Sequence, residues 1–127
     1  TLKRLLKPGG RAVIQVITID DTLFDQYRRG TDFIQRHVFP GGMLPSPAAF
    51  RSQALRAGLA MTDDLAFGSH YARTLGLWHE AFQERLLEVQ SQGFDDRFIR
   101  LWRFYLAYCE AGFRAGSIDV HQYTLQA

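Results

Sequence analysis

The run Arg11–Ile19 does most to restrict the folds open to this chain. Its sequence, Arg-Ala-Val-Ile-Gln-Val-Ile-Thr-Ile, is almost entirely apolar and rich in β-branched residues. Such a run predicts a strand buried on both faces, as in a parallel sheet. Gln15 is the polar side chain in its middle, and a buried amide needs hydrogen-bond partners. Gln15 is therefore either tied to nearby backbone or directed into a site, because α/β sheets bind ligands at the carboxyl ends of their strands.

Helical and strand patterns follow one another along the rest of the chain, which favours an α/β layer structure. Caps and apolar periodicity predict helices at residues 2–6, at 20–38 with a bend at Gly30, from an N-cap at Ser46 to Gly58, from an N-cap at Ser69 to Gly93, and from an N-cap at Asp95 to about Gly116. Strands are predicted at 59–67 and 118–125, the second at a sheet edge or beside an antiparallel partner. We expect residues 1–127 to form one helix-rich segment with about three strands.

A rigid turn, Phe39–Pro45, lies between two of these segments. Its two prolines fix φ, and its two adjacent glycines permit backbone angles that are closed to other residues. The turn carries an aromatic residue on one side and Met43 and Leu44 on the other. We therefore expect it to lie against an apolar surface, which is either the domain's own core or the wall of a ligand site.

Composition and motifs exclude several classes of protein. The net charge of +2, with acids and bases interleaved, does not indicate nucleic-acid binding. The single cysteine, Cys109, excludes an internal disulfide, and the four histidines lack the spacing of metal ligands. No apolar run approaches the ~20 residues of a membrane helix, and no glycine-rich phosphate loop is present. Because residues 2–6 read as the end of a helix, we expect this chain to be a piece of a longer protein.

Several stretches resemble those of one enzyme family. Residues 6–10 (Leu-Lys-Pro-Gly-Gly), ahead of a strand, resemble the segment before the fifth strand of class I S-adenosylmethionine-dependent methyltransferases. More specific are residues 39–46, 70–75, 77–78, 109–114 and 120–122. In their order and separation they resemble the cyclopropane-fatty-acid synthase family, which includes the mycolic acid cyclopropane synthases and methyltransferases. The likeness covers nearly the whole chain.

The resemblance implies the C-terminal part of a class I methyltransferase (Rossmann-like) sheet. It implies a transferase that adds a methylene group, as a cyclopropane, or a methyl group to the double bond of a lipid acyl chain or phospholipid. In this family the alkene attacks the methyl group of S-adenosylmethionine, and the resulting carbocation loses a proton to bicarbonate. Aromatic faces stabilise such a cation, which would give the 13% aromatic residues a purpose. The cofactor would be bound upstream, so this chain alone would bind no S-adenosylmethionine and catalyse nothing.

The resemblance also implies roles in anion binding. Tyr71 matches the tyrosine whose hydroxyl helps to hold the bicarbonate, and Ile17 matches the position whose backbone does likewise. Gln15 stands where well-studied members have a histidine. Because glutamine cannot carry charge or relay a proton, the anion would be held more weakly, or a methyl group would be transferred without ring closure.

Three further residues match the acyl pocket of the family. Phe39 and Leu75 match positions that line the pocket near the reacting carbons. Cys109 matches a pocket cysteine, which we interpret as a small apolar wall and not as a nucleophile.

Two other functions stay open. The chain could be part of a methyltransferase for amines or other small molecules, with Tyr71 and the turn at Phe39 walling a small pocket. It could also be a non-catalytic helical module that forms homo-oligomers through exposed apolar helices. For the lipid enzyme we expect a cytoplasmic protein with peripheral contact at the inner membrane surface.

Overall fold

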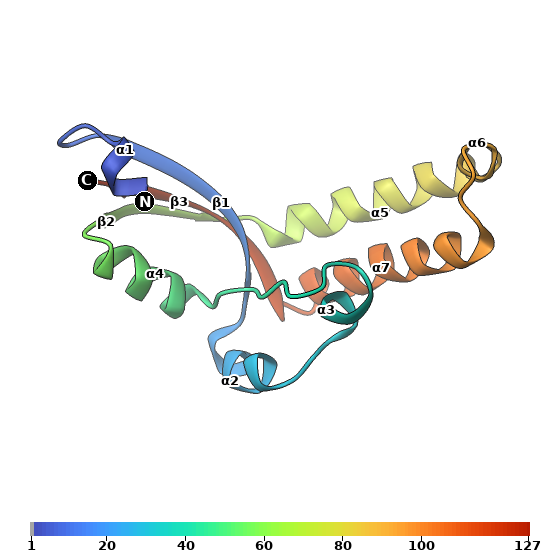
Figure 1. The fold of residues 1–127 in the computed structure, drawn as a ribbon, viewed down its shortest axis with the longest axis horizontal. Helices are drawn as coiled ribbons and strands as arrows, with labels where there is room; N and C mark the ends of the chain where they lie inside the picture. The colour runs from blue at the N-terminus through green and yellow to red at the C-terminus, as the bar shows by residue number, and fades with distance from the viewer. Residues whose placement is uncertain (1) are drawn as a thin grey trace.

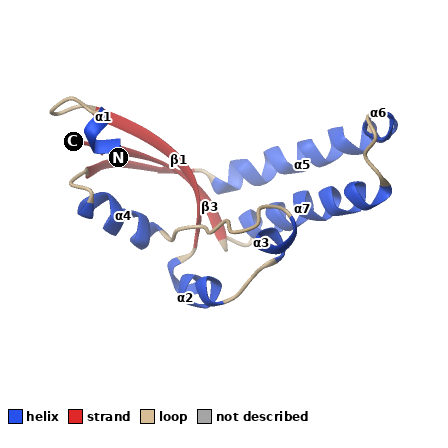
Figure 2. Cartoon of the chain, in the orientation of Figure 1, coloured by secondary structure: helices blue, strands red, loops and turns tan. Residues whose placement is uncertain are grey.

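The computed structural model describes residues 2–127 as a small sheet from which two long helices project side by side (Figure 1). The elements are α1 (Leu2–Leu5), β1 (Arg11–Ile19), α2 (Asp21–Arg29), α3 (Phe33–His37), α4 (Pro47–Arg56), β2 (Ala60–Ala66), α5 (Gly68–Glu84), α6 (Leu86–Ser91), α7 (Asp96–Arg114) and β3 (Ile118–Gln126). Strands gather at one end of the molecule and the α5–α7 pair forms the other (Figure 2). The expected α/β class, with three strands and several helices, is confirmed.

The sheet has the strand order β1-β3-β2, and both pairs are antiparallel. Ile17 on β1 lies opposite Val120 on β3, and Leu65 on β2 lies opposite Gln122. The prediction that the last strand has an antiparallel partner is confirmed. The other alternative, a position at the sheet edge, is not observed, because β3 pairs along both of its sides.

Strand β1 has the predicted bounds but not the predicted burial. Exposure alternates along it, Val13 is 65% exposed, and only Thr18 and Ile19 are buried. Within residues 2–127 its sole strand neighbour is the antiparallel β3, so the expected parallel environment is not observed. Gln15 is exposed, and its Oε1 accepts a hydrogen bond of 3.0 Å from Gln122 Nε2. The prediction of a buried glutamine is therefore wrong as well.

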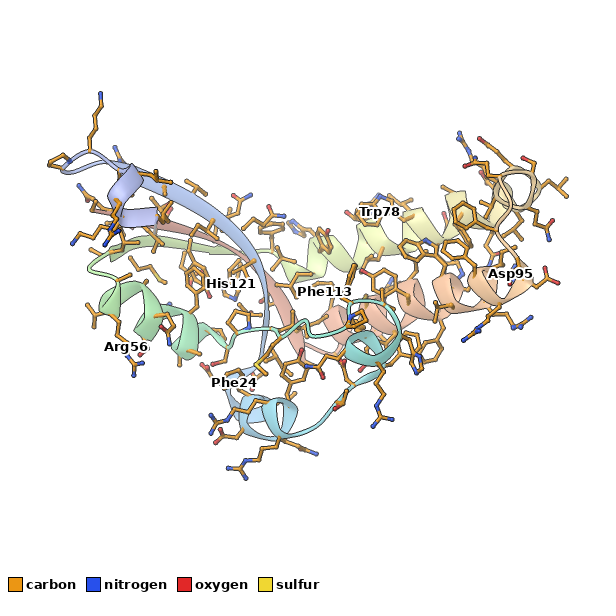
Figure 3. The ribbon with its side chains drawn as sticks, viewed as in Figure 1. Phe24, Arg56, Trp78, Asp95, Phe113 and His121 are labelled. Atoms are coloured by element: carbon orange, nitrogen blue, oxygen red, sulfur yellow. The ribbon has the colours of Figure 1, made fainter. Side chains whose placement is uncertain are left out.

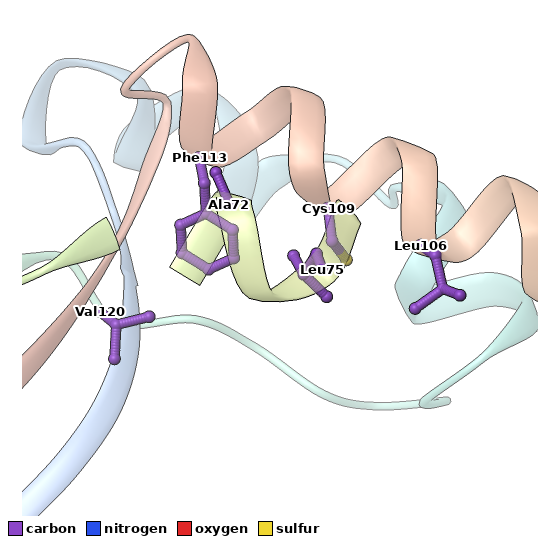
Figure 4. Close-up of a cluster of buried hydrophobic side chains, with 6 residues drawn as sticks. All are labelled: Ala72, Leu75, Leu106, Cys109, Phe113 and Val120. Carbon is purple, nitrogen blue, oxygen red and sulfur yellow. The ribbon is translucent and has the colours of Figure 1, made fainter. Parts of the chain in front are cut away.

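Two apolar cores lie on opposite faces of the sheet, because alternate residues of β3 point to opposite sides. Tyr123 and Leu125 face α4, where Phe50 stacks on Tyr123 with ring centroids 4.4 Å apart. Val120 faces the α5–α7 pair and completes a second buried cluster (Figure 4). Its members are Ala72, Leu75, Leu106, Cys109, Phe113 and Val120. This second cluster fixes the helical pair to the sheet.

Most helix starts are set by local capping. Ser46 caps α4 by accepting the Ala49 N–H, and Asp95 caps α7 by accepting the Phe98 N–H, as predicted. The predicted cap at Ser69 is wrong, since α5 begins one residue earlier.

The start of α5 is capped from a distant strand. The Gly68 N–H donates to Asp119 Oδ1 on β3 over 2.7 Å. The helix predicted to continue to Gly93 is also interrupted, because Arg85 leaves helical geometry (φ −110°, ψ 21°) and divides it into α5 and α6.

The turn at residues 39–45 is held by side chains of the two preceding helices. Tyr27 of α2 accepts the Leu44 N–H over 3.1 Å, and Gln35 of α3 donates to the Gly42 carbonyl over 3.0 Å. Leu44 is half-buried, but Phe39 and Met43 are 56% and 58% exposed. The expectation that the whole turn lies against an apolar surface is therefore wrong for its two largest apolar residues.

None of the helices in residues 2–127 has both the length and the apolar character needed to cross a membrane.

We predict that two glycines of α5 respond in opposite directions to alanine. At Gly68 an added Cβ would collide with the Asp119 carboxylate and lie 3.1 Å from its Cα, so Gly68→Ala should lower the free energy of unfolding by about 1–3 kcal/mol. At Gly76 an added Cβ would meet only Glu110, at 3.5 Å or more. Gly76→Ala should therefore raise stability by about 0.5–1 kcal/mol. Urea unfolding of both variants measures this, and a stabilised Gly68→Ala would contradict the close approach.

Candidate functional site

Four of the six residues singled out from the sequence meet where the α5–α7 pair joins the sheet. Leu75 and Cys109 are buried members of the second core cluster, 3% and 7% exposed. Ile17 and Tyr71 are half-buried and pack against the same cluster. Figure 4 shows Leu75 of α5 and Cys109 of α7 directed into the space between the two helices. Residues from one strand and two separate helices thus share one apolar environment.

Tyr71 lies in the first turn of α5, just after the Gly68–Asp119 contact. Its ring lies 5.3 Å from that of Phe113 and meets Trp78 edge-on at 6.0 Å. Aromatic pairs at these distances favour defined ring orientations. The start of α5 and these two rings therefore fix the direction of the Tyr71 side chain.

The backbone of Ile17 faces away from β3. The Asp20 N–H donates to the carbonyl of Ser117, just before β3, over 3.0 Å. The Ile19 N–H points the other way and donates to the carbonyl of Pro45 over 3.0 Å. Successive residues of a strand direct their N–H and C=O groups to opposite edges. Ile17 is in phase with Ile19, so its N–H and C=O point to the edge of β1 that pairs with no strand in residues 2–127. No strand of residues 2–127 therefore hydrogen-bonds with the backbone of Ile17.

Gln15 lies outside this cluster. It is on the same face of β1 as Ile17, two residues earlier, and its side chain is exposed. Because Gln122 occupies its Oε1, its amide NH₂ is the group left to donate to a ligand.

Phe39 joins the cluster only through a residue that sequence reasoning missed. Its ring meets that of Tyr105 edge-on at 6.1 Å, and Tyr105 lies 4.9 Å from Trp102 and packs against the buried core. Tyr105 precedes Cys109 by four residues, a spacing that places two side chains on one face of a helix. That spacing is the signal that could have identified it.

The hydroxyl of Tyr105 and the thiol of Cys109 are both uncharged at neutral pH. Burial raises the pKa of the Tyr105 hydroxyl to about 12. Burial also raises the pKa of the Cys109 thiol to about 11, although a hydrogen bond with Tyr105 opposes the rise. The thiolate is the nucleophilic form of cysteine, so Cys109 acts as a neutral wall at physiological pH.

An apolar groove of about 420 Å³ lies between α7 and the α2–α3 segment. Its walls are Ile19, Leu23, Tyr27, Asp32, Ile34, Leu44, Tyr108, Ala111, Gly112, Ala115, Ser117 and Ile118. Ile34 and Ile118 also pack against the core cluster that contains Leu75 and Cys109. None of the six predicted site residues lines the groove, which meets their cluster only through Ile34 and Ile118. No part of the described chain gathers three or more metal-ligating side chains.

Comparison with known proteins gives a consistent set of relatives. A family model described as mycolic acid cyclopropane synthetase matches residues 1–123. The tuberculostearic acid methyltransferase UfaA1 of Mycobacterium tuberculosis is 43% identical over 125 residues, covering 98% of this chain and 29% of that protein. The cyclopropane mycolic acid synthase MmaA2 of the same organism is 40% identical over 96 residues, covering 73% of this chain and 32% of that protein. The chain thus spans about a third of the curated relatives it matches.

Solved structures show the same likeness. The cyclopropane synthase MmaA2 from Mycobacterium tuberculosis superposes with a TM-score of 0.88 at 31% identity, over 99% of this chain and 47% of that one. The mycolic acid cyclopropane synthase CmaA1, complexed with SAH and CTAB, superposes with a TM-score of 0.88 at 30% identity. The match covers 98% of this chain and 47% of that one. A sarcosine dimethylglycine methyltransferase homologue from Galdieria sulphuraria shares the fold alone, with a TM-score of 0.73 at 19% identity over 98% and 44%.

We predict that stability falls at alkaline pH through Cys109. The folded thiol has its pKa raised from 9.0 to about 11, so between these values the unfolded chain loses its proton while the folded chain keeps it. The contribution of Cys109 to the free energy of unfolding should be constant below pH 9. It should decrease as the pH rises from 9 toward 11. Urea unfolding at several pH values checks this against Cys109→Ala, which should show a shallower decrease. Identical slopes would contradict the buried neutral thiol.

Proposed function

The chain belongs to the mycolic acid cyclopropane synthetase family, and from this premise we propose that it forms the acyl-chain-facing part of a lipid-modifying enzyme. That enzyme would transfer a methylene or methyl group from S-adenosylmethionine to the double bond of a lipid acyl chain. The observation that carries the proposal is the apolar groove beside α7, because it shares Ile34 and Ile118 with the cluster around Leu75 and Cys109.

The groove suits a hydrocarbon chain. Its lining is mostly aliphatic, and burying apolar surface there contributes about 25 cal/mol per Å². Small residues of α7, Ala111, Gly112 and Ala115, leave room along one wall. The CmaA1 structure complexed with CTAB, a lipid-like detergent, supports an aliphatic occupant for this family.

The residues near the open edge of β1 suit a small anion such as bicarbonate. The backbone N–H of Ile17 points to that edge, and the hydroxyl of Tyr71 and the NH₂ of Gln15 are further donors on the same side of the sheet. Neutral donors hold an anion less firmly than a charged histidine does. This favours methyl transfer without ring closure, and the methyltransferase name of the 43% identical relative supports that branch.

The aromatic rings beside the core cluster do not line the groove, but they would stabilise positive charge on an acyl carbon that reaches from the groove to the cluster. Tyr105 is protonated at physiological pH, as any tyrosine with a pKa of 10.0 or above is, and burial raises its pKa further to about 12. Trp102 and Phe39 flank it. The faces of such rings attract cations, and they do so more strongly where water is excluded. The same rings cannot take up a proton or act as nucleophiles.

The described residues do not fit a cradle for the cofactor. The strands of residues 2–127 are all antiparallel, whereas a nucleotide-binding turn follows a parallel strand. The helix after β1 is capped by its own Asp20 side chain, which accepts the Thr22 N–H over 2.8 Å. S-adenosylmethionine supplies the methyl group in the proposed reaction, and we place its binding in the part of the relatives' length that this chain does not span.

A chimera tests the proposal. These 127 residues would replace the aligned segment of the tuberculostearic acid methyltransferase of Mycobacterium tuberculosis. Methyl transfer from labelled S-adenosylmethionine to a monounsaturated phospholipid would be followed by mass spectrometry. We expect an active chimera, and we expect Tyr71→Phe to lower kcat by about 10²–10³, the usual cost of losing one donor to a developing charge.

The matched control is Tyr123→Phe, which removes a hydroxyl that is buried on the other face of the sheet without a hydrogen-bond partner. This variant should retain full activity. If Tyr71→Phe were no slower than Tyr123→Phe, Tyr71 would have no role in the reaction. A folded chimera that neither bound the lipid nor transferred the methyl group would contradict the proposed function.

A further inference from the structure

We propose that an exposed aromatic and arginine surface on α3 and α7 docks this protein on an anionic phospholipid surface. We call it the Phe104 surface, and it consists of Phe33, Arg36, Arg97, Arg100, Phe104 and Tyr108. The choice of lipid as the partner rests on the proposed function, because the acyl groove opens beside this surface. The docking itself can be measured without any enzymatic activity.

The aromatic part of the surface is a fixed cluster. Phe33 of α3 meets Phe104 of α7 edge-on at 4.5 Å and lies 5.9 Å from Tyr108. Phe104 and Tyr108 stack at 5.9 Å, yet they remain 52% and 41% exposed. Tyrosine is enriched at membrane interfaces, and phenylalanine is common on the apolar face of helices that lie in the interface. Because the three rings pack on one another, little side-chain freedom would be lost when a partner binds them.

The surface lies on the side of α7 opposite the core. Leu106 and Cys109 point toward α5, and the helical period places Phe104 and Tyr108 on the other side. Arg100 precedes Phe104 by four residues and Arg97 precedes it by seven, so all of these side chains share one stripe. The arginines therefore extend the aromatic cluster along the helix.

The arginines of this surface are exposed and carry charge that is free for a partner. Arg36, Arg97 and Arg100 are exposed, and none of them forms an ion pair with another part of residues 2–127. The arginines that do form ion pairs lie elsewhere: Arg28, Arg51, Arg85 and Arg114. Each exposed arginine near an anionic bilayer adds attraction, so the cluster complements anionic lipid headgroups.

Three acidic residues at the starts of α3 and α7 accept hydrogen bonds from within the protein. Asp32 caps α3 and Asp95 caps α7, and each accepts a backbone N–H over 2.8 Å. Asp96 accepts a hydrogen bond from Gln90 Nε2 over 3.2 Å. Carboxylates held in this way offset the positive ends of the helices and leave the arginines to attract an anionic partner.

The groove and the surface share a wall. Tyr108 belongs to the aromatic cluster and also lines the groove, and Asp32 and Ile34, on either side of Phe33, line it too. An acyl chain that leaves the groove at this wall emerges beside the rings. Its headgroup then meets the arginines, which is the arrangement of a bilayer surface with the acyl layer behind it.

Vesicle sedimentation tests the proposal. We expect the protein to pellet with vesicles of phosphatidylcholine and phosphatidylglycerol but not with phosphatidylcholine alone, and we expect added salt to release it. Arg97→Gln with Arg100→Gln should weaken binding about twenty-fivefold, since each arginine near the surface contributes about a fivefold effect. Phe104→Ser should weaken it further.

Matched control variants distinguish binding through the Phe104 surface from the effects of net charge and of exposed apolar area elsewhere. Arg11→Gln with Arg56→Gln removes the same charge from exposed positions at the sheet end, where Figure 3 shows Arg56 on α4, far from Asp95 of α7. Leu55→Ser removes another apolar side chain, 75% exposed, from α4. Both should bind vesicles like the wild type, and circular dichroism verifies that every variant is folded.

Ala111→Trp separates this inference from the proposed function. It would fill the groove and abolish binding of a fluorescent fatty acid while leaving vesicle binding intact. The docking surface would be overturned if the Arg97/Arg100 and Arg11/Arg56 double variants lost vesicle binding equally. Tight binding of the wild type to neutral vesicles would also overturn it. Binding of poly-glutamate without binding of vesicles would show instead that the surface recognises acidic protein. A dimer that loses its stability on Phe104→Ser, without vesicle binding, would assign the surface to a second copy of the chain.

Discussion

The close packing of α5 and α7 against Val120 of β3 is the contact on which the rest of the structure depends. It is the only large apolar cluster of residues 2–127 that joins the helical pair to the sheet. The Gly68–Asp119 contact fixes the angle at which α5 leaves the sheet, because no side chain larger than hydrogen fits there. The positions of Tyr71, Leu75 and Cys109 relative to Ile17 follow from this one junction.

Local features of the fold could be predicted from the sequence, and contacts between distant segments could not. Ser46 and Asp95 cap their helices through the next few residues, so their roles can be inferred from short patterns. Asp119 caps α5 from 51 residues away, and no local pattern indicates it. The β-branched run predicts the strand β1, but its antiparallel partner and its exposed face depend on where the chain returns as β3.

The candidate site divides in the same way. Resemblance pointed to Tyr71, Leu75, Cys109 and Ile17, which the fold brings together. It also pointed to Phe39, which reaches the cluster through Tyr105, and to Gln15, which lies outside it. Tyr105 was identifiable only from its helical spacing to Cys109. The groove could not be predicted, because it forms between α7 and a segment that lies more than 60 residues earlier in the chain. The lining of the groove is mostly aliphatic, which is why we propose a hydrocarbon as its occupant.

The most direct measurement of the central claim is to locate an acyl chain on this protein. A monounsaturated fatty acid with a photoreactive diazirine near its double bond would be irradiated with the protein, and the adducts would be mapped by mass spectrometry. We expect adducts at groove residues such as Ile34, Leu44 and Ala111. Adducts confined to exposed apolar residues outside the groove, such as Val13 and Leu87, would contradict the claim that this chain holds the acyl substrate.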